Sequence, residues 1–190
     1  MIDFSKPVRL RGIHAAYAQY LSTERGQKRE GGVNVFSRIM DAYMVSILIG
    51  LKYNRTAMED ESEVLAKDIF LVSKNSEDKK ISSSDINSET IHASQDKLNY
   101  IYRIVMLNED VRKLSDEEKI ANAFKSENNP EKIEDNIKLM NSFDRGGLEI
   151  LYERFQGLAN REDEILQTQL DIFEEFMDIG NIYYDDEIHY

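Results

Sequence analysis

Cysteine and tryptophan are absent from the chain, and proline occurs only twice. Without cysteine there is no disulfide scaffold, no thiol chemistry and no cysteine-ligated zinc or iron–sulfur site. The longest apolar run, Ala42–Leu51, is bounded by Asp41 and Lys52 and has about half of the roughly 20 residues that a membrane span requires. The first residues also lack the charged, apolar and small-residue order of a secretory signal. We therefore expect a cytoplasmic protein that does not enter a membrane.

Lysine and arginine are also absent from residues 162–190, which contain ten aspartates and glutamates. Along the chain, residues 1–57 carry nine basic and four acidic residues, or +5, and residues 58–190 carry 15 basic and 32 acidic residues, or −17. This acidic excess argues against binding nucleic acid over a wide face. It is typical of a solvated surface that keeps a protein soluble, and it also suits the docking of a basic partner.

A local basic contact nevertheless fits the N-terminal region. The candidate residues for it are Arg9, Arg11, Arg25, Lys28 and Arg29. Apolar residues recur there at three- and four-residue steps from Leu10 to Leu21. This spacing predicts an amphipathic helix over about residues 8–23, with Arg9 and Arg11 on its polar side. A glycine-bounded polar loop with a basic centre follows at residues 25–32.

The most apolar segment predicts a second helix over about residues 34–52, just before a basic exit at residues 52–55. This helix is apolar on nearly every side, so the rest of the domain has to bury it. Residues 54–94 lack a regular pattern. Short extended pieces at residues 69–72 and 86–91 indicate a mobile insertion or a small β-hairpin.

The second half of the chain returns to helices with clear start and stop signals. Apolar spacing predicts a helix over about residues 95–108. A capping box at Ser115 starts a short helix through Phe124, and Asn129, followed by a proline, starts another. Gly146 predicts the end of that helix, because glycine readily adopts the left-handed conformation of a helix terminus.

The last predicted helix begins at Asn160, carries three acidic residues in its first turn and stops at Gly180. Its apolar stripe consists of Ile165, Leu166, Leu170, Phe173, Phe176 and Met177. Two interpretations remain open, since such a stripe either packs against the core or faces a partner. The aromatic and acidic tail beyond it either frays or offers anchors to a partner. The candidate partner-binding residues are Phe173, Phe176, Met177, Tyr183 and Tyr184.

These patterns predict a mainly α fold, with a compact helical domain around a buried central helix. The domain carries a small irregular or short β-hairpin insertion and an acidic C-terminal helix. Residues 1–157 form the helical core domain, with its insertion at about residues 54–94, and residues 158–190 form the acidic amphipathic helix and tail. A length of 190 residues suits one main core with an attached helical end.

Catalytic residue types do not gather in a recognisable arrangement. His14 lies within the first predicted helix, where a structural role is favoured, and His92 and His189 lie in irregular or terminal segments. The chain contains no phosphate-binding glycine loop, no zinc-protease spacing and no nucleophile elbow. We therefore expect no enzymatic activity, no cofactor and no bound metal.

One arrangement does resemble that of metal-dependent nucleases. Asp68 lies beside the first extended piece, and Glu77 and Lys79 follow it. Nucleases of this kind use carboxylates to bind Mg²⁺ and activate water. Glu77, however, falls in a polar loop with no second strand to hold it rigidly, so a solvated charged loop is the favoured interpretation.

Two blocks of the chain resemble a known family. Phe36–Arg55 combines an aromatic residue, an aspartate, an apolar run, a glycine and a basic exit, and Asn141–Leu151 carries Gly-Gly-Leu at an expected helix end. In this order, the blocks resemble small accessory proteins found with bacterial DNA-phosphorothioation (Dnd) restriction clusters, over about residues 33–157. The first helix, the long insertion and the acidic final helix depart from that pattern.

The resemblance implies a noncatalytic adaptor or accessory subunit of a bacterial antiphage defence or DNA restriction complex. Its partners would be larger ATPase or nuclease subunits, which it bridges, and DNA would be contacted only indirectly. The residues are compatible with this role, because the chain combines a helical core with two oppositely charged ends. The alternative is a small DNA-binding regulator that uses the basic N-terminal residues.

Overall fold

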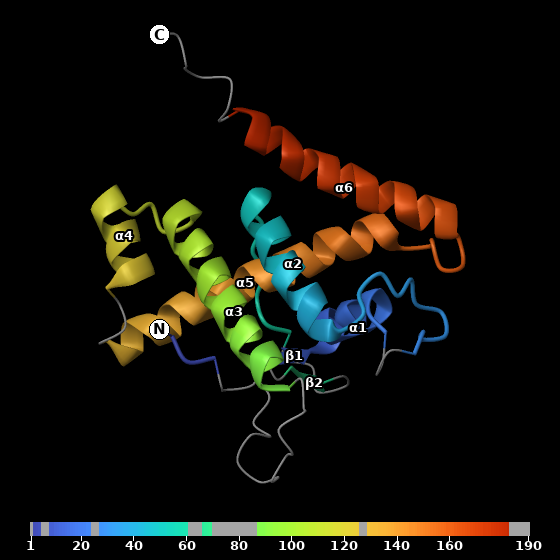
Figure 1. Ribbon diagram of the computed structural model, residues 1–190, viewed down its shortest axis with the longest axis horizontal. Helices are drawn as coiled ribbons and strands as arrows, with labels where there is room; N and C mark the ends of the chain where they lie inside the picture. Colours follow the sequence, from blue (N-terminus) through green and yellow to red (C-terminus); the bar gives the residue numbers. More distant parts are fainter. Residues whose placement is uncertain are drawn as a thin grey trace, which may run out of the picture.

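The computed structural model describes residues 2–4, 8–23, 27–60, 66–69, 87–125 and 129–182. Its elements in chain order are β1 (Val8–Arg11), α1 (Gly12–Leu21), α2 (Ile39–Lys52), β2 (Ala66–Ile69), α3 (Asn87–Asn108), α4 (Asp116–Phe124), α5 (Pro130–Phe155) and α6 (Glu162–Ile182) (Figure 1). The fold is mainly helical, as predicted. Within the described ranges, no helix combines the length and the apolar character needed to cross a membrane.

The long helix α5 is the axis of the arrangement (Figure 1). Helices α1, α2 and α3 all pack against it, and α2 also contacts both of its neighbours, α1 and α3. Helix α4 packs on α3, and α6 runs back from the end of α5 along the outside of the molecule. The apolar α2 thus lies at the centre of the helical group, which is the position its sequence predicts.

Residues 8–11 form a strand, which corrects the prediction of a helix over residues 8–23. Leu10 is buried and Arg9 is exposed, so the side chains alternate with the two-residue period of a strand. β1 pairs antiparallel with β2, and the register places Arg9 opposite Asp68. Strand β2 supplies the backbone partners, and only the residues after β1 continue as helix α1.

Of the two interpretations of residues 54–94, a mobile insertion or a small hairpin, the hairpin between residues 69–72 and 86–91 is wrong. β2 ends at Ile69 and pairs with β1 near the start of the chain, while residues 70–72 lie outside the described part. Residues 87–91 are helical and belong to the first turns of α3. Residues 87–94 are therefore helical and do not belong to the irregular segment expected over residues 54–94.

Helix α2 begins at Ile39 and not near residue 34, because the preceding segment is extended and bonded to the end of α1. The backbone N–H of Val33 donates to the Tyr20 carbonyl oxygen at 3.0 Å, and the N–H of Phe36 donates to the Leu21 carbonyl oxygen at 3.0 Å. These hydrogen bonds, together with the bridge between Ser22 and Phe36, hold residues 33–36 against the end of α1, so the helix starts only after them.

Helix α5 continues through Gly146 without a break, so the predicted helix end there is wrong. Gly146 and Gly147 lie where α5 crosses α2. A Cβ atom on Gly147 would lie 1.8 Å from the Ser46 carbonyl oxygen, and one on Gly146 would lie 2.1 Å from the Arg55 carbonyl oxygen. Gly50 of α2 makes the reciprocal approach, since a Cβ there would lie 2.0 Å from the Phe143 carbonyl oxygen. The glycines allow two backbones to touch, and they do not terminate the helix.

Asp144 is fully buried at the same crossing. The Ser46 hydroxyl contacts both Asp144 Oδ1 and the Tyr43 carbonyl oxygen, the latter at 2.8 Å. One hydroxyl proton cannot serve two acceptors, whereas a protonated Asp144 can donate to Ser46 Oγ and leave Ser46 to donate to Tyr43. Asp144 Oδ2 has no partner among the described residues, and burial raises the pKa of Asp144 to about 7. Both observations favour the neutral carboxylic acid.

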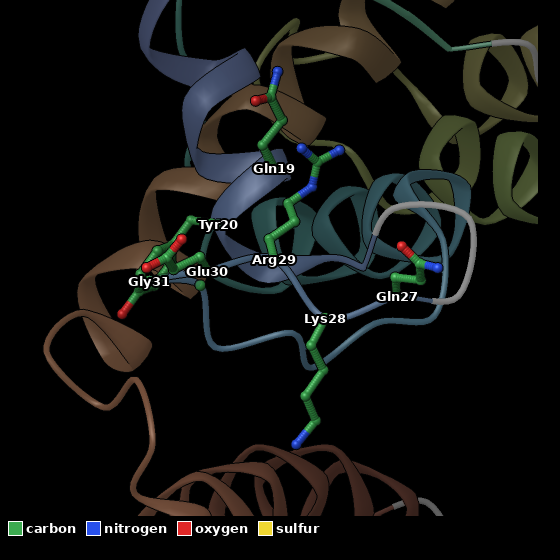
Figure 2. A pocket seen from close by; sticks show the side chains of 8 residues that line it. Gln19, Tyr20, Gln27, Lys28, Arg29, Glu30 and Gly31 are labelled. Atoms are coloured by element: carbon green, nitrogen blue, oxygen red, sulfur yellow. The ribbon is translucent and has the colours of Figure 1, made fainter.

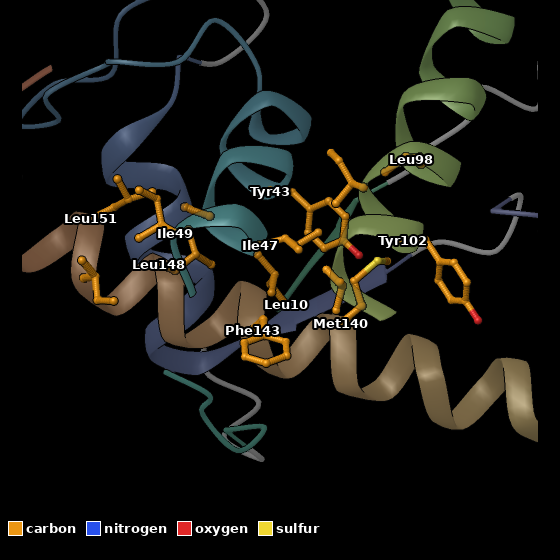
Figure 3. Close-up of a cluster of buried hydrophobic side chains, with 14 of the residues drawn as sticks. Leu10, Tyr43, Ile47, Ile49, Leu98, Tyr102, Met140, Phe143, Leu148 and Leu151 are labelled. Carbon is orange, nitrogen blue, oxygen red and sulfur yellow. The ribbon is translucent and has the colours of Figure 1, made fainter. Parts of the chain in front are cut away.

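The hydrophobic core fills the space between α5 and the helices that cross it (Figure 3). Its largest fully buried side chains are Tyr43, Tyr102, Phe143, Phe155, Leu10, Leu21, Ile47, Ile49, Leu98, Met106 and Met140. The N-terminal segment closes one side of this core with the buried Ile2 and Phe4. Asn99 of α3 holds that segment by accepting from the Ile2 N–H at 2.8 Å and donating to the Ile2 carbonyl at 3.1 Å.

The predicted start signals of α4 and α5 are confirmed. The Glu118 N–H donates to Ser115 Oγ at 3.3 Å and the Ser115 N–H donates to Glu118 Oε2 at 2.9 Å, which completes the capping box. Asn129 Oδ1 accepts from the Lys132 N–H at 3.1 Å, with Pro130 at the first helical position. Both motifs act within one turn, so the sequence alone identifies them.

Candidate partner-binding surface

Helix α6 has two different apolar sides. Ile165, Ile172 and Phe176 face the molecule and pack against its core. The other side carries Leu166, Leu170, Phe173 and Met177, which we call the outer stripe. Steps of four, three and four residues place these four side chains on one face of a helix. Helix α6 therefore uses one edge for attachment and leaves a second apolar face to solvent.

The outer stripe is well exposed. Phe173 is 60% accessible, Leu166 56%, Met177 51% and Leu170 46%. Single exposed apolar residues are normal on a protein surface, but four in a row on one helix face form a continuous apolar strip. Such strips, rimmed by polar residues, are typical of protein–protein contact sites.

Acidic side chains border the outer stripe. Asp163, Asp171 and Glu174 are exposed along its solvent side, and none of them has a basic partner among the described residues. The one described contact among these three is that of Asp171, which accepts from the Gln167 side-chain amide at 2.7 Å. The stripe is thus an apolar strip with an unneutralised acidic border, which we call the acidic flank.

A group of polar side chains, which we call the clasp, fastens α6 near its C-terminal half. Glu175 accepts two hydrogen bonds from Arg154 of α5, at 3.0 and 3.1 Å, and one from the Tyr53 hydroxyl at the end of α2. Arg154 also lies over the Tyr53 ring at 5.3 Å and donates to its hydroxyl at 2.6 Å. Lys52 donates to the Glu175 backbone carbonyl and lies 4.5 Å from the centre of the Phe176 ring.

The clasp depends on the charge of Glu175. Its hydrogen bonds from Arg154 and then Tyr53 lower the pKa of Glu175 below the usual glutamate value. The contribution of this carboxylate is therefore present above the unfolded-state pKa and is lost as the pH falls through the lower folded-state pKa. At neutral pH the clasp is fully charged.

The predicted partner-binding residues divide between the two sides of α6. Phe173 and Met177 belong to the outer stripe, whereas Phe176 turns inward beneath the Lys52 ammonium group. Tyr183 and Tyr184 lie outside the described residues. Leu166 and Leu170 were absent from the predicted set, although their spacing to Phe173 carries the helical signal that could have placed them there.

Helix α6 also starts and ends later than predicted. It begins at Glu162 and not Asn160, and it continues through Gly180 to Ile182. Asn160 instead has a positive φ of 66° in the turn between α5 and α6. Asparagine tolerates this left-handed conformation better than other residues with a side chain.

The predicted basic contact residues do not form one surface. Arg9 and Arg11 lie in β1, and Lys28 and Arg29 lie beyond the other end of α1, a helix of ten residues or about 15 Å. Arg11 pairs with Glu59 at 3.6 Å and Lys28 pairs with Glu162 at 3.4 Å. Arg25 lies outside the described residues. The described arginines and lysine therefore occupy two separate places, each with an acidic neighbour.

An open hollow of about 870 Å³ adjoins the loop that carries Lys28 (Figure 2). It is lined by Gln19, Tyr20, Gln27, Lys28, Arg29, Glu30, Gly31 and Gly32. Figure 2 shows Lys28 pointing toward α6, in agreement with its ion pair to Glu162. The hollow is thus lined by the acidic Glu30 as well as by the basic Lys28 and Arg29. Lys28 is already paired with Glu162 at the start of α6.

The nuclease-like residues do not come together in the described part. Asp68 lies in β2, and Glu77 and Lys79 are outside the described residues. Among the residues that are described, no group of three or more histidine, aspartate and glutamate side chains could hold a metal ion.

His14 is buried against α5. Its Nε2 atom lies 3.3 Å from Glu149 Oε1, and its Nδ1 atom has no partner among the described residues. Burial lowers the pKa of His14 more than Glu149 raises it. Arg55 pairs with the other oxygen of the same carboxylate, and its guanidinium lies 2.8 Å from Glu149 Oε2. The arrangement packs a neutral histidine between α1 and α5, in keeping with the structural role expected from the sequence.

These features define a small, mainly helical protein with an acidic amphipathic helix attached to its surface. No protein-family model, no curated protein and no solved structure matches the chain.

Proposed function

We propose that this protein is a noncatalytic adaptor subunit that binds a larger protein through the outer stripe of α6. The assembly we propose is a bacterial antiphage defence or DNA restriction complex, and the partners are its ATPase or nuclease subunits. The resemblance of Phe36–Arg55, and of the Gly-Gly-Leu sequence within Asn141–Leu151, to accessory proteins of phosphorothioation-linked restriction clusters supports the choice of assembly, although Gly-Gly-Leu lies inside α5 and not at a helix end. The close contact between these two blocks, at the crossing of α2 and α5, makes them the rigid centre of such a subunit.

The exposure of the outer stripe is the observation that carries the binding role. Four large apolar side chains on one face of α6 remain outside the core, although the same helix packs other apolar side chains, which are partly buried, against that core. Leaving them in water is unfavourable, at about 25 cal/mol for each Å² of apolar surface. A partner that covers the stripe recovers this free energy.

A bridging role also needs a second surface. Helices α3 and α4 expose Tyr100, Leu107 and Phe124, and the Arg103 guanidinium lies 5.3 Å from the centre of the Phe124 ring. Helix α4 packs on α3 and has no comparable contact with α6. We propose this α3–α4 face as the second contact surface of the adaptor.

Co-purification tests the proposal. The tagged protein is expressed together with the products of its neighbouring genes, either unchanged or with Leu170→Ser and Phe173→Ser in the outer stripe. A double variant with Gln167→Ser and Gln169→Ser is the control, because it also introduces two serines into α6 but leaves the stripe intact. We expect a neighbouring gene product to co-purify with the unchanged and control proteins and to be lost with the stripe variant. Co-purification that survives the stripe variant, or that never occurs, contradicts the proposal.

A further inference from the structure

We infer that the outer stripe binds a basic amphipathic helix of the partner protein, with apolar residues at three- and four-residue spacing and lysine or arginine beside them. This inference rests on the proposed adaptor function and specifies the chemistry of its partner.

The charge of the acidic flank identifies the partner as basic. Asp163, Asp171 and Glu174 border the stripe without basic partners in the described part of the chain, whereas Glu162 and Glu175 are already paired with Lys28 and Arg154. The acids engaged inside the molecule are thus different from those beside the stripe. A partner that covers the apolar strip has to meet the remaining carboxylates, and only basic side chains do so favourably.

A second copy of this chain does not fit the same surface. Residues 162–190 contain ten acids and no lysine or arginine. Two copies of α6 that paired antiparallel through their stripes would bring their acidic flanks together, and like charges across a helix pair are destabilising. A parallel pair would instead place the flank of each copy against the edge of the other that carries Ile165 and Phe176, and that edge is already packed on its own core. The stripe therefore favours a partner of a different kind over self-association.

The shape of the surface points to a helix. The stripe runs from Leu166 to Met177, which is about three helical turns or 17 Å. Its steps of four, three and four residues match the spacing by which two helices interlock along an apolar seam. A partner helix of similar length would place its apolar side chains between those of the stripe and its basic residues opposite the acidic flank.

Two synthetic peptides test the inference. Both are helical, have leucine at the same stripe spacing and differ only in that the flanking positions are lysine in one and glutamate in the other. Fluorescence anisotropy measures their binding to the full-length protein at low and high salt. We expect the lysine peptide to bind the unchanged protein, and to bind it more weakly at high salt. Its binding should be lost when the protein carries Leu170→Ser and Phe173→Ser. We expect the glutamate peptide not to bind.

Neutralising the flank separates charge from apolar contact. The double variant Asp171→Asn and Glu174→Gln keeps the stripe and the size of both side chains. We expect it to lower the affinity for the lysine peptide about fivefold. The single variant Gln169→Ser, which keeps Gln167 and its contact with Asp171, should leave this affinity unchanged. Circular dichroism confirms that each variant remains helical.

Three results overturn the inference. One is equal binding of the two peptides, and another is a dimer in sedimentation experiments that the stripe variant abolishes. The third is a neighbouring gene product whose co-purification requires the stripe but not the acidic flank. That last result leaves the adaptor function intact, whereas the absence of both peptide binding and co-purification removes the adaptor function as well.

Discussion

Helices α2 and α6 are both attached to α5, but in opposite ways. Helix α2 crosses the middle of α5 with backbone against backbone, because Gly50 and Gly147 leave no side chains between the two helices. Helix α6 lies over the end of α5 and is fastened by the polar clasp around Glu175. The first contact is buried and insensitive to solvent, and the second is partly exposed and depends on charge. The comparison separates a rigid centre from a helix that remains available to a partner.

The difference follows from the side chains at each contact. At the α2–α5 crossing, glycine permits an approach at which many atoms meet, and the dispersion attraction of close packing accumulates. At α6, partly exposed ion pairs contribute little each, because water and salt screen them. We therefore expect changes at the crossing to affect the whole fold, and changes at the clasp to affect α6 alone.

The largest expected effect is that of Gly147→Ala. Its new Cβ would lie 1.8 Å from the Ser46 carbonyl oxygen, so α2 and α5 have to separate. We expect a loss of about 3 kcal/mol or more in the free energy of unfolding, measured by urea denaturation. Gly157→Ala is the control, because Gly157 has a φ of +78° but no atom within 4 Å of a Cβ, and its strain costs about 1 kcal/mol. Equal stability of the two variants would contradict the close crossing.

An intermediate and pH-dependent effect is expected for Asp144→Asn. Burial raises the pKa of Asp144 to about 7, so the folded state keeps a proton that the unfolded chain releases near pH 4. The stability that this proton provides is complete below about pH 4 and is lost as the pH rises through about 7. We therefore expect the substitution to raise stability by roughly 2 kcal/mol at about pH 8, relative to its effect at about pH 5.5. Urea denaturation at both pH values measures this difference.

The control for that experiment is Asp171→Asn, which removes an exposed carboxylate of α6. Its effect should stay within about 0.5 kcal/mol at either pH. If the effect of Asp144→Asn on the free energy of unfolding were also the same at both pH values, the buried carboxyl group would not be neutral in the folded protein.

The smallest effect on overall stability is expected for Glu175→Ala. Without this carboxylate the clasp loses its ion pair to Arg154, and α6 opens more often while the crossing stays intact. We expect backbone amides of α6 to exchange hydrogen about fivefold faster, with unchanged exchange in α2 and in the middle of α5. Mass spectrometry of exchanged fragments measures both regions.

Glu174→Ala is the matched control for the clasp, since the neighbouring Glu174 is exposed and lies on the acidic flank. It should leave the exchange of α6 unchanged. A general acceleration that reaches α2 in the Glu175 variant would mean that α6 and the crossing unfold as one unit, and the comparison between them would fail.

Local signals in the sequence predicted much of the helical framework correctly. The capping box at Ser115 and the cap at Asn129 act through atoms within one turn. The helix starts that they specify therefore do not depend on distant residues. The apolar character of α2 also required burial whatever covered it. In the same way, the acidic composition of residues 162–190 predicted an acidic helix, and that helix is present as α6.

Other elements depended on residues far away in the chain. Residues 8–11 carry spacing that suits either a helix or a strand, and the pairing with β2 decides for the strand. Local rules favour a helix end at Gly146, but the close approach of the backbone of Arg55 and Thr56, just after α2, gives this glycine a packing role within an unbroken helix. The sequence predicted the apolar residues of α6 as one stripe, and the contact with α5 and α2 divides them into an inner edge and an outer stripe.

Local sequence was thus enough to specify the helical class of this protein, the caps of α4 and α5, and the acidic character of its last helix. These properties arise from hydrogen bonds and charges between near neighbours in the chain. Only the tertiary structure decided which strands pair, why glycines occupy the centre of α5, and which apolar side chains of α6 remain in solvent. Each of these depends on atoms that folding brings together from distant positions, and a local pattern does not contain that information.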